Sequence, residues 1–221
     1  MLGLYIGIIL LLNIPYVQHR MSVLVAKELS TVLGSELTVG RINIGLLNRI
    51  IIDDLVLNDQ SGKELLKIGR LSAKFEILPL FSGKISIGNV QLFSFNANLE
   101  RPTPQASTNF QFVLDAFASK DTVKKKSNLD LRINSLLIRR GKVSYDVLSA
   151  ESTPGKFNPQ HIRLSNILAN ISLKALQNDS VNAAIKRMSV EEEHSGFELK
   201  KLSLKIIAND RKMRIENFAI D

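Results

Sequence analysis

Apolar residues alternate with polar ones along most of this chain, which is the pattern of β-strands with one apolar face. The stretch Glu36 to Asp59, ELTVGRINIGLLNRIIIDDLVLND, shows the alternation most clearly. It predicts one strand from Leu37 to Ile44, a Gly-Leu-Leu-Asn turn, and a second strand from Ile50 to Asn58. The alternation changes phase at Gly40-Arg41, as a β-bulge would require.

The same unit, an alternating strand with a break centred on Gly or Asn, recurs to the end of the chain. It predicts further strands at Leu65 to Phe75, Ile85 to Leu99, Leu131 to Tyr145, Ile162 to Leu173, Val181 to Met188, Phe197 to Ile207 and Met213 to Ile220. A degenerate repeat of roughly 20 residues favours one extended sheet over a single globular core. We therefore expect a mainly β protein built on a long, curved antiparallel sheet.

The first 17 residues, MLGLYIGIILLLNIPYV, depart from this alternation. They are apolar on all sides of a helix, which predicts a transmembrane anchor. A buried core helix or a cleaved signal peptide would also be apolar. The nearest cations, Arg20 and Lys27, follow the segment, so its orientation in the membrane stays open. The candidate anchor residues are Leu2, Leu4, Ile6, Ile8, Ile9, Leu10, Leu11 and Leu12.

Two further segments predict amphipathic helices. One runs from Gln18 to Leu33, with Gly34 as its C-cap, and the other from Asn109 to Ser119. We therefore divide the chain into an anchor at 1–17, a helix at 18–34, a first β-repeat region at 35–100, a loop with a short helix at 101–128, and a continuing β-repeat region at 129–221.

The charge of the chain suits anionic partners. The 221 residues carry a formal net charge of +8, which favours nucleic acid or lipid headgroups. The cations are dispersed and lack interleaved aromatic residues, so we expect no nucleic-acid binding. The run Lys124 to Lys126 fits a solvated loop or, alternatively, contact with acidic headgroups.

The sequence offers little that could carry catalysis. Cysteine is absent, which excludes disulfides, thiolate metal sites and a cysteine nucleophile. The acidic run before His194 fits a solvated turn better than a metal site, because consecutive residues point in different directions. Asp53 and Asp54 are adjacent in a strand, which predicts one carboxylate on each face. We expect no catalytic residues, no metal, no cofactor and no enzymatic activity.

Three segments together resemble the N-terminal part of AsmA-like proteins, particularly the TamB (translocation and assembly module) branch. They are IPYVQ, LSTVLGSELTVGRINIGLLNRIIIDDLVLND and LLKIGRLSAKFEILPLFSGKISIGNVQL, within residues 1–100. The later half is similar only in its strand-repeat character. The resemblance implies a single-pass inner-membrane protein of a Gram-negative cell, with its bulk in the periplasm. It also implies that the chain is an N-terminal fragment, because the family's C-terminal domain is missing.

In that family the sheet forms an open hydrophobic groove, a β-taco-like conduit that carries phospholipids toward the outer membrane. The family is also linked to outer-membrane protein assembly with a barrel partner, which the absent C-terminal region would engage. The expected partners here are thus phospholipid acyl chains and the membrane. The candidate groove-lining residues are Ile42, Ile44, Leu55, Leu57, Leu71, Phe75, Ile85, Ile87, Phe93 and Phe95.

Two alternatives to this groove remain. An apolar sheet face that few helices cover could instead pack against a second sheet in an ordinary sandwich. The protein could also be a structural scaffold whose exposed strand edge accepts client β-strands without lipid transport.

Overall fold

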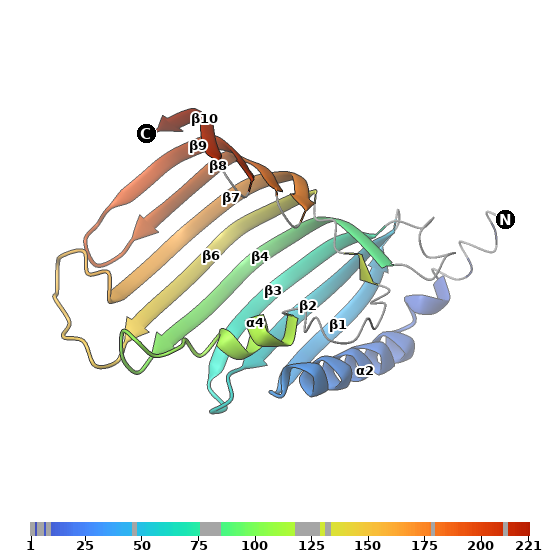
Figure 1. Cartoon of the computed structure of the whole chain (residues 1–221). Coiled ribbons are helices and arrows are strands. Elements are labelled where there is room, and N and C mark those ends of the chain that lie inside the picture. The colour runs from blue at the N-terminus through green and yellow to red at the C-terminus, as the bar shows by residue number, and fades with distance from the viewer. Residues whose placement is uncertain are drawn as a thin grey trace.

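The computed structural model describes Gly3, Gly7 and residues 10–45, 48–75, 85–117, 129–130, 134–177, 180–209 and 212–221. Within them, the chain forms one ten-stranded sheet flanked by two helices (Figure 1). The strands are β1 (Leu37–Gly45), β2 (Arg49–Asn58), β3 (Glu64–Phe75), β4 (Ile85–Arg101), β5 (Leu129–Asp130), β6 (Ser135–Val147), β7 (His161–Gln177), β8 (Ser180–Glu192), β9 (Glu198–Asn209) and β10 (Met213–Ile220). The helices are α2 (Pro15–Leu33) and α4 (Gln111–Phe117).

The strands follow one another across the sheet in the order β1-β2-β3-β4-β6-β7-β8-β9-β10, and the short β5 pairs with β4. The expectation of a mainly β protein with an open sheet is confirmed. The two predicted β regions join in this one sheet through β4 and β6. Figure 1 shows the sheet twisting from β1 at one edge to β10 at the other, as right-twisted strands require.

The expectation of a purely antiparallel sheet is wrong at β4, which pairs in parallel with both β6 and the short β5. β4 and β6 are parallel, from Asn89 opposite Ser135 to Arg101 opposite Val147. Parallel neighbours need a crossover connection, because the chain must return to the end where the first strand began. The segment that contains α4 supplies this crossover.

The first described helix confirms the predicted amphipathic helix, but it begins at Pro15 rather than Gln18. Proline is favoured in the first turn because its missing N–H would have no helical partner there. The helix ends at Gly34, whose φ of 65° is left-handed and whose N–H donates to the carbonyl oxygen of Ser30. The expected C-cap is thus confirmed.

The predicted transmembrane anchor receives no support. No helix among the described residues is long and apolar enough to cross a membrane. Of the candidate anchor residues, Leu10, Leu11 and Leu12 are described and helical. The other five, Leu2, Leu4, Ile6, Ile8 and Ile9, lie outside the described residues. The anchor stays a prediction.

A line of backbone irregularities crosses the sheet. β2, β4, β6, β7 and β10 each contain one residue with left-handed φ, namely Asp54 (56°), Ser94 (53°), Arg140 (55°), Asn166 (50°) and Asn217 (53°). In β1 and β3, glycines occupy the opposite positions. A Cβ added at Gly40 would lie 3.0 Å from the Cβ of Asp54, and one at Gly69 would lie 3.3 Å from that of Ser94.

The predicted β-bulge at Gly40-Arg41 is wrong, and the left-handed residue opposite Gly40 explains the change of phase instead. A bulge shifts the pairing register, because two residues oppose one. The register here is constant, with Val39 opposite Leu55 and Arg41 opposite Asp53. Both strands change phase together, so their apolar side chains stay on the same face across the irregularity.

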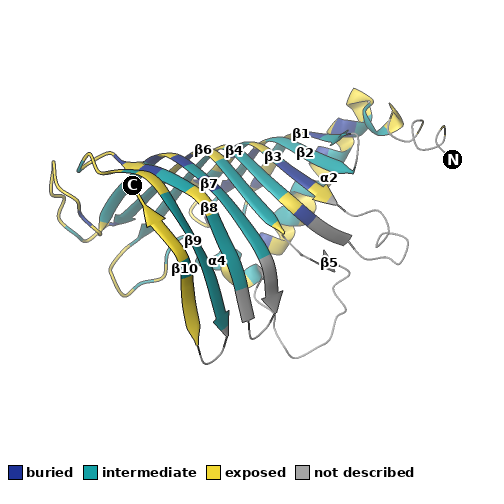
Figure 2. Ribbon diagram, turned by 90° about the horizontal axis from the view of Figure 1, so that it is seen from above, coloured by how far each residue is buried: buried dark blue, intermediate teal, exposed yellow. Residues whose placement is uncertain are grey.

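The buried core lies at the β1 edge of the sheet. Leu33 of α2 packs there with Leu37, Leu55, Leu57, Leu65 and Ile68. Phe110 precedes α4, and Phe112, Val113 and Ala116 lie within it; all four pack against this cluster. Further buried residues lie on β6, β7 and β8, and Figure 2 shows β10 coloured exposed along most of its length.

Candidate functional site

A single row of apolar side chains runs from one edge of the sheet to the other. Residues directly opposite each other on neighbouring strands point to the same face. Following the register from β1 to β10 gives the row Ile42, Ile52, Leu71, Leu92, Ile138, Ala169, Met188, Leu202 and Ile220. Every strand of the main order contributes one member. We call the face that bears this row the apolar face.

The apolar face is covered at one end and open at the other. Leu57 and Ile68 are only 3% and 5% exposed beneath the helices. Phe218 and Ile220 of β10 are 60% and 62% exposed. Between them, most apolar-face residues of β6 to β9 are half-buried, because they have strand neighbours but no described covering layer. We call the part on β6 to β10 the open apolar face.

The structure brings several predicted groove residues together on the apolar face. Ile42, Leu55 and Leu57 are buried, and Ile44, Leu71 and Phe95 are half-buried. Leu55 and Leu57 belong to the core cluster below α2. Phe75, Ile85 and Ile87 lie in β3 and β4, with Phe75 opposite Ile87, but their side chains lie outside the described part. Most of the described candidates therefore lie in the part of the apolar face that the helices cover.

Phe93 is the exception, and its predicted place beside Phe95 is wrong. Phe93 lies opposite Arg70 and Arg139, and it lines a recess of about 370 Å³ on the polar face of the sheet. The phase changes at Ser94, one residue later than the sequence suggested. Phe93 and Phe95 therefore point to opposite faces.

The residues of the open apolar face were absent from the candidate groove residues. They belong to strands that the alternation had predicted, so their two-residue periodicity could have identified them. Only the register shows that they continue the row begun in β1. They include Leu136, Ile138, Val143 and Tyr145 in β6, Ile162, Leu164, Ile167 and Ile171 in β7, Ile185 and Met188 in β8, and Leu202, Leu204 and Ile206 in β9.

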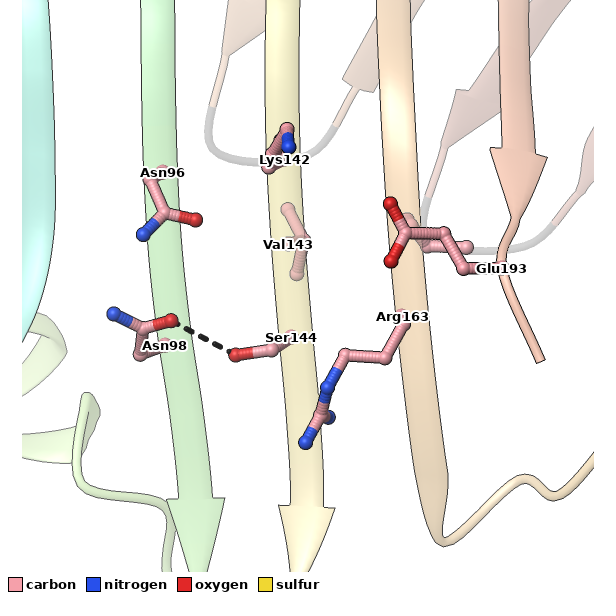
Figure 3. A pocket seen from close by; sticks show the side chains of 8 residues that line it. Asn96, Asn98, Lys142, Val143, Ser144, Arg163 and Glu193 are labelled. Carbon is pink, nitrogen blue, oxygen red and sulfur yellow. Dashed lines mark hydrogen bonds between the residues drawn. The ribbon is translucent and has the colours of Figure 1, made fainter. Parts of the chain in front are cut away.

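The opposite face of the sheet is polar and carries a shallow recess of about 280 Å³ (Figure 3). Ser144 Oγ donates to Asn98 Oδ1 at 3.0 Å, and Arg163 lies opposite Ser144 in the next strand. Lys142 and Glu193 complete the charged lining. Val143 and Leu164 also line the recess, so it combines polar donors and acceptors with two apolar side chains.

A histidine beside this recess is fully engaged in structure. His161 Nδ1 lies 2.9 Å from Asp146 Oδ1, and Nε2 lies 3.0 Å from the carbonyl oxygen of Ala150. Arg163 also contacts Asp146, at 2.8 Å. These hydrogen bonds, first the one to Asp146, raise the pKa of His161. Because both ring nitrogens already have partners, the ring has no free atom for a substrate proton.

Glu192 stabilises the turn between β8 and β9. It is 2% exposed and accepts hydrogen bonds from the Ser195 hydroxyl at 2.6 Å and the Ser195 N–H at 2.8 Å. Burial raises the pKa of Glu192, but the hydrogen bonds outweigh burial and lower it to about 2. The interpretation of Glu191 to His194 as a solvated run is therefore wrong for Glu192. No group of three metal-ligating residues occurs in the described part of the chain.

Asp53 and Asp54 share one face of the sheet, contrary to the expectation of one carboxylate on each. Asp53 Oδ1 accepts from Arg70 Nε at 2.6 Å. That bond and the charges of Asp53 and Asp54 raise the pKa of Arg70, so both carboxylates lie near the guanidinium. The left-handed φ of Asp54 brings its side chain to the side of Asp53.

No protein-family model matches the chain, and no curated protein matches it. The similarity to AsmA-like proteins therefore stays a prediction.

Proposed function

We propose that the open apolar face holds phospholipid acyl chains, and that the protein is a lipid-conducting or envelope-assembly module. The row of apolar residues across all strands of the main order is the observation that carries this proposal. Large exposed apolar patches on soluble proteins mark interaction sites, because their contact with water is unfavourable. Burying such surface contributes about 25 cal/mol per Å².

An acyl chain suits this surface better than a compact ligand does. The apolar row runs across the strands, and neighbouring strands are about 4.8 Å apart. The open apolar face therefore forms a continuous stripe several strands wide. A flexible hydrocarbon chain can follow a twisted stripe, whereas a rigid ligand needs a closed pocket.

Arg101 gives the same face a contact for a lipid headgroup. It lies at the end of β4 opposite Val147, on the apolar face, with its guanidinium carbon 5.3 Å from the centre of the Tyr145 ring. Its Nε is buried and has no hydrogen-bond partner within the described chain. A buried donor without a partner is unfavourable, and a phosphate oxygen would satisfy it. A phospholipid supplies both the phosphate and the acyl chains.

The proposed location follows from the same account. We place the protein at the inner membrane, with its sheet in the periplasm, where lipid must cross an aqueous space. The outward side of α2 supports membrane contact. Tyr16, Val23 and Leu24 are more than half exposed there, and the cations Arg20 and Lys27 are exposed beside them. Aromatic and aliphatic residues mixed with Lys and Arg suit the membrane interface.

The test compares lipid carried by three versions of the full chain, namely wild type, Ile138→Asp and Arg139→Asp. These two residues are neighbours in β6, but they point to opposite faces. We expect wild type and Arg139→Asp to co-purify with equal amounts of phospholipid by mass spectrometry, and Ile138→Asp to carry several-fold less. Lipid that surrounds a membrane anchor would co-purify with all three versions. The test therefore rests on the difference in the amount of phospholipid between the versions. Equal lipid in all three would refute the proposal.

A further inference from the structure

A recess of about 370 Å³ lies on the polar face, where the line of backbone irregularities crosses β3, β4 and β6. It is lined by Gly69, Arg70, Phe93, Ser94 and Arg140, and we call it the Phe93 recess. A Cβ added at Gly69 would lie 3.3 Å from the Cβ of Ser94, so the two strands approach closely there. Because position 69 has no side chain and position 94 has a small one, the surface is hollowed between the larger side chains around them.

The polar side chains that line the Phe93 recess are all hydrogen-bond donors, and no carboxylate is among them. Arg70 Nε donates to Asp53 at 2.6 Å, which holds this guanidinium in place and leaves its terminal N–H groups for a ligand. Arg140 and Ser94 are exposed, and their side chains form no hydrogen bond or ion pair with the described part of the chain. Guanidinium and hydroxyl donors around a hollow suit an oxyanion, because their N–H and O–H groups match phosphate or carboxylate oxygens.

The charges around the recess also favour an anion. Phe93 and Asn96 belong to two neighbouring rows of the polar face, and β3 and β6 contribute only cations to these rows. The acids near Arg70 are Asp53 and Asp54, both on β2. The cations outnumber these acids, so the local potential attracts anions. These cations are Lys67, Arg70, Arg139, Arg140 and Lys142.

Phe93 adds an aromatic surface to this cationic recess. Its side chain is half-buried, and it lies between Arg70 and Arg139 in the register. The cation–π contacts in the described part of the chain are made by Tyr16 and Tyr145. No described guanidinium therefore stacks on the Phe93 ring, and the ring is available to a planar group of a ligand.

We propose that the Phe93 recess binds an oxyanion attached to an aromatic ring, that is, an aryl phosphate or an aromatic carboxylate. Arg140, Ser94 and the terminal N–H groups of Arg70 donate to the oxyanion, and the aromatic ring of the ligand stacks on Phe93. Inorganic phosphate lacks the ring, and a neutral aromatic molecule lacks the charge. The recess lies on the polar face, so this ligand binds independently of anything on the apolar face.

The first test places a fluorescent reporter in the recess. The chain contains no tryptophan, so a single introduced one gives the whole tryptophan signal. The variant Phe93→Trp keeps an aromatic ring in the recess, and the control Tyr145→Trp carries the same reporter on the apolar face. Titration of the full-length variants with phenyl phosphate should change the fluorescence saturably in Phe93→Trp and leave Tyr145→Trp unchanged. No saturable change in Phe93→Trp, or the same change in both variants, would overturn the proposal.

Three further probes separate the two parts of the ligand in Phe93→Trp. Inorganic phosphate and benzyl alcohol should each bind several-fold more weakly than phenyl phosphate, because each lacks one of the two contacts. Benzoate, which has both a ring and a carboxylate, should bind saturably. Inorganic phosphate that binds as tightly as phenyl phosphate would refute the role of the ring. Benzyl alcohol that binds as tightly would refute the role of the charge.

A pair of charge-removing variants distinguishes a defined site from general attraction. Added to Phe93→Trp, Arg140→Gln should weaken phenyl phosphate binding by about tenfold, because a charge-assisted hydrogen bond is lost. Lys142→Gln is the matched control. It removes the same charge from the same strand and face, but Lys142 does not line this recess, so we expect little change. Equal weakening by the two variants would overturn the proposal.

Saturation-transfer NMR repeats the measurement with Phe93 in place. The resonances of phenyl phosphate should receive saturation from the unaltered full-length chain and much less from Arg140→Gln. Equal transfer from the two would contradict the proposal. The inference does not rest on lipid binding. Absence of phenyl phosphate binding leaves the lipid carried by wild type and Ile138→Asp as expected above, and equal lipid in those versions leaves the Phe93 recess untouched.

Discussion

The ring of Phe95 in β4 occupies the space where a side chain at position 141 would begin. A Cβ added at Gly141 would overlap Cε1 of that ring and lie 2.9 Å from Cδ1. Phe95 lies beside Gly141 across the parallel pair of β4 and β6. Because Gly141 has no side chain, a large aromatic residue fits on the apolar face where the two β regions join.

Gly141→Ala should destabilise the protein by about 1–3 kcal/mol, because the ring must move out of its place. Urea unfolding measures the difference. Gly88→Ala in β4 is the matched control. A Cβ there meets its nearest atom at 3.7 Å, which is an ordinary contact, so we expect little change.

A double variant checks the cause. In Phe95→Ala the obstructing ring is gone, so adding Gly141→Ala to it should cost much less than adding it to wild type. Equal costs in the two backgrounds would show that the contact with Phe95 is not what requires a glycine.

Glu192→Gln should destabilise the protein at neutral pH by about 1–3 kcal/mol, since the buried hydrogen bonds lose their charged acceptor. The folded-state pKa of about 2 lies below the ordinary glutamate pKa of 4.5. The stabilisation is thus present above the unfolded-state pKa, and it is lost as the pH falls toward 2. Urea unfolding at neutral pH and near pH 2 measures both values.

The exposed neighbour Glu193 provides the control for this prediction. Glu193→Gln should have little effect at either pH, because that side chain is exposed. A destabilisation by Glu192→Gln that persists unchanged near pH 2 would rule out the carboxylate charge as its source.

The raised pKa of His161 predicts the opposite pH dependence of the protein's stability. Its folded-state pKa is raised above 6.5 by Asp146 and Ala150, so protonation stabilises the folded protein. This contribution is complete below the unfolded-state pKa and disappears as the pH rises through the folded-state pKa. His161→Gln should therefore destabilise more at about pH 5.5 than at about pH 9. Thermal unfolding of this variant and of His19→Gln, whose ring is exposed, measures the contrast.

The covered and open parts of the apolar face should respond differently to truncation. Leu57→Ala should cost about 2–5 kcal/mol, because Leu57 is 3% exposed within the core cluster. Ile138→Ala should cost less, since Ile138 is half-buried and no described element covers it. Equal losses in urea unfolding would mean that β6 packs against a layer like the one that covers β2.

The strands were predictable because each one is long enough to show its alternation. The phase change at Gly40 was also visible, since Val39 and Ile42 break the two-residue period. The sequence could not show its cause. A β-bulge in one strand and a change of phase in both paired strands give the same pattern in a single strand. The paired register distinguishes them, and the residues that fix the register lie in different strands.

The same reason explains the misplacement of Phe93. The sequence LFSFN is apolar at both phenylalanines, and either phase could be continued through it. The left-handed φ of Ser94 decides the outcome, and it depends on Gly69 in the neighbouring strand. The parallel pairing of β4 and β6 was equally hidden, because the intervening segment does not reveal where the chain re-enters the sheet.

The central claim is that lipid contacts one face of the sheet and not the other. Two aromatic residues test it, Tyr145 on the apolar face and Phe93 on the polar face. Each is replaced in turn by the photoreactive amino acid p-benzoylphenylalanine, in the full chain within cells. Mass spectrometry after irradiation should find phospholipid attached at position 145 and none at position 93. Equal labelling at both positions, or labelling at 93 alone, would contradict the account.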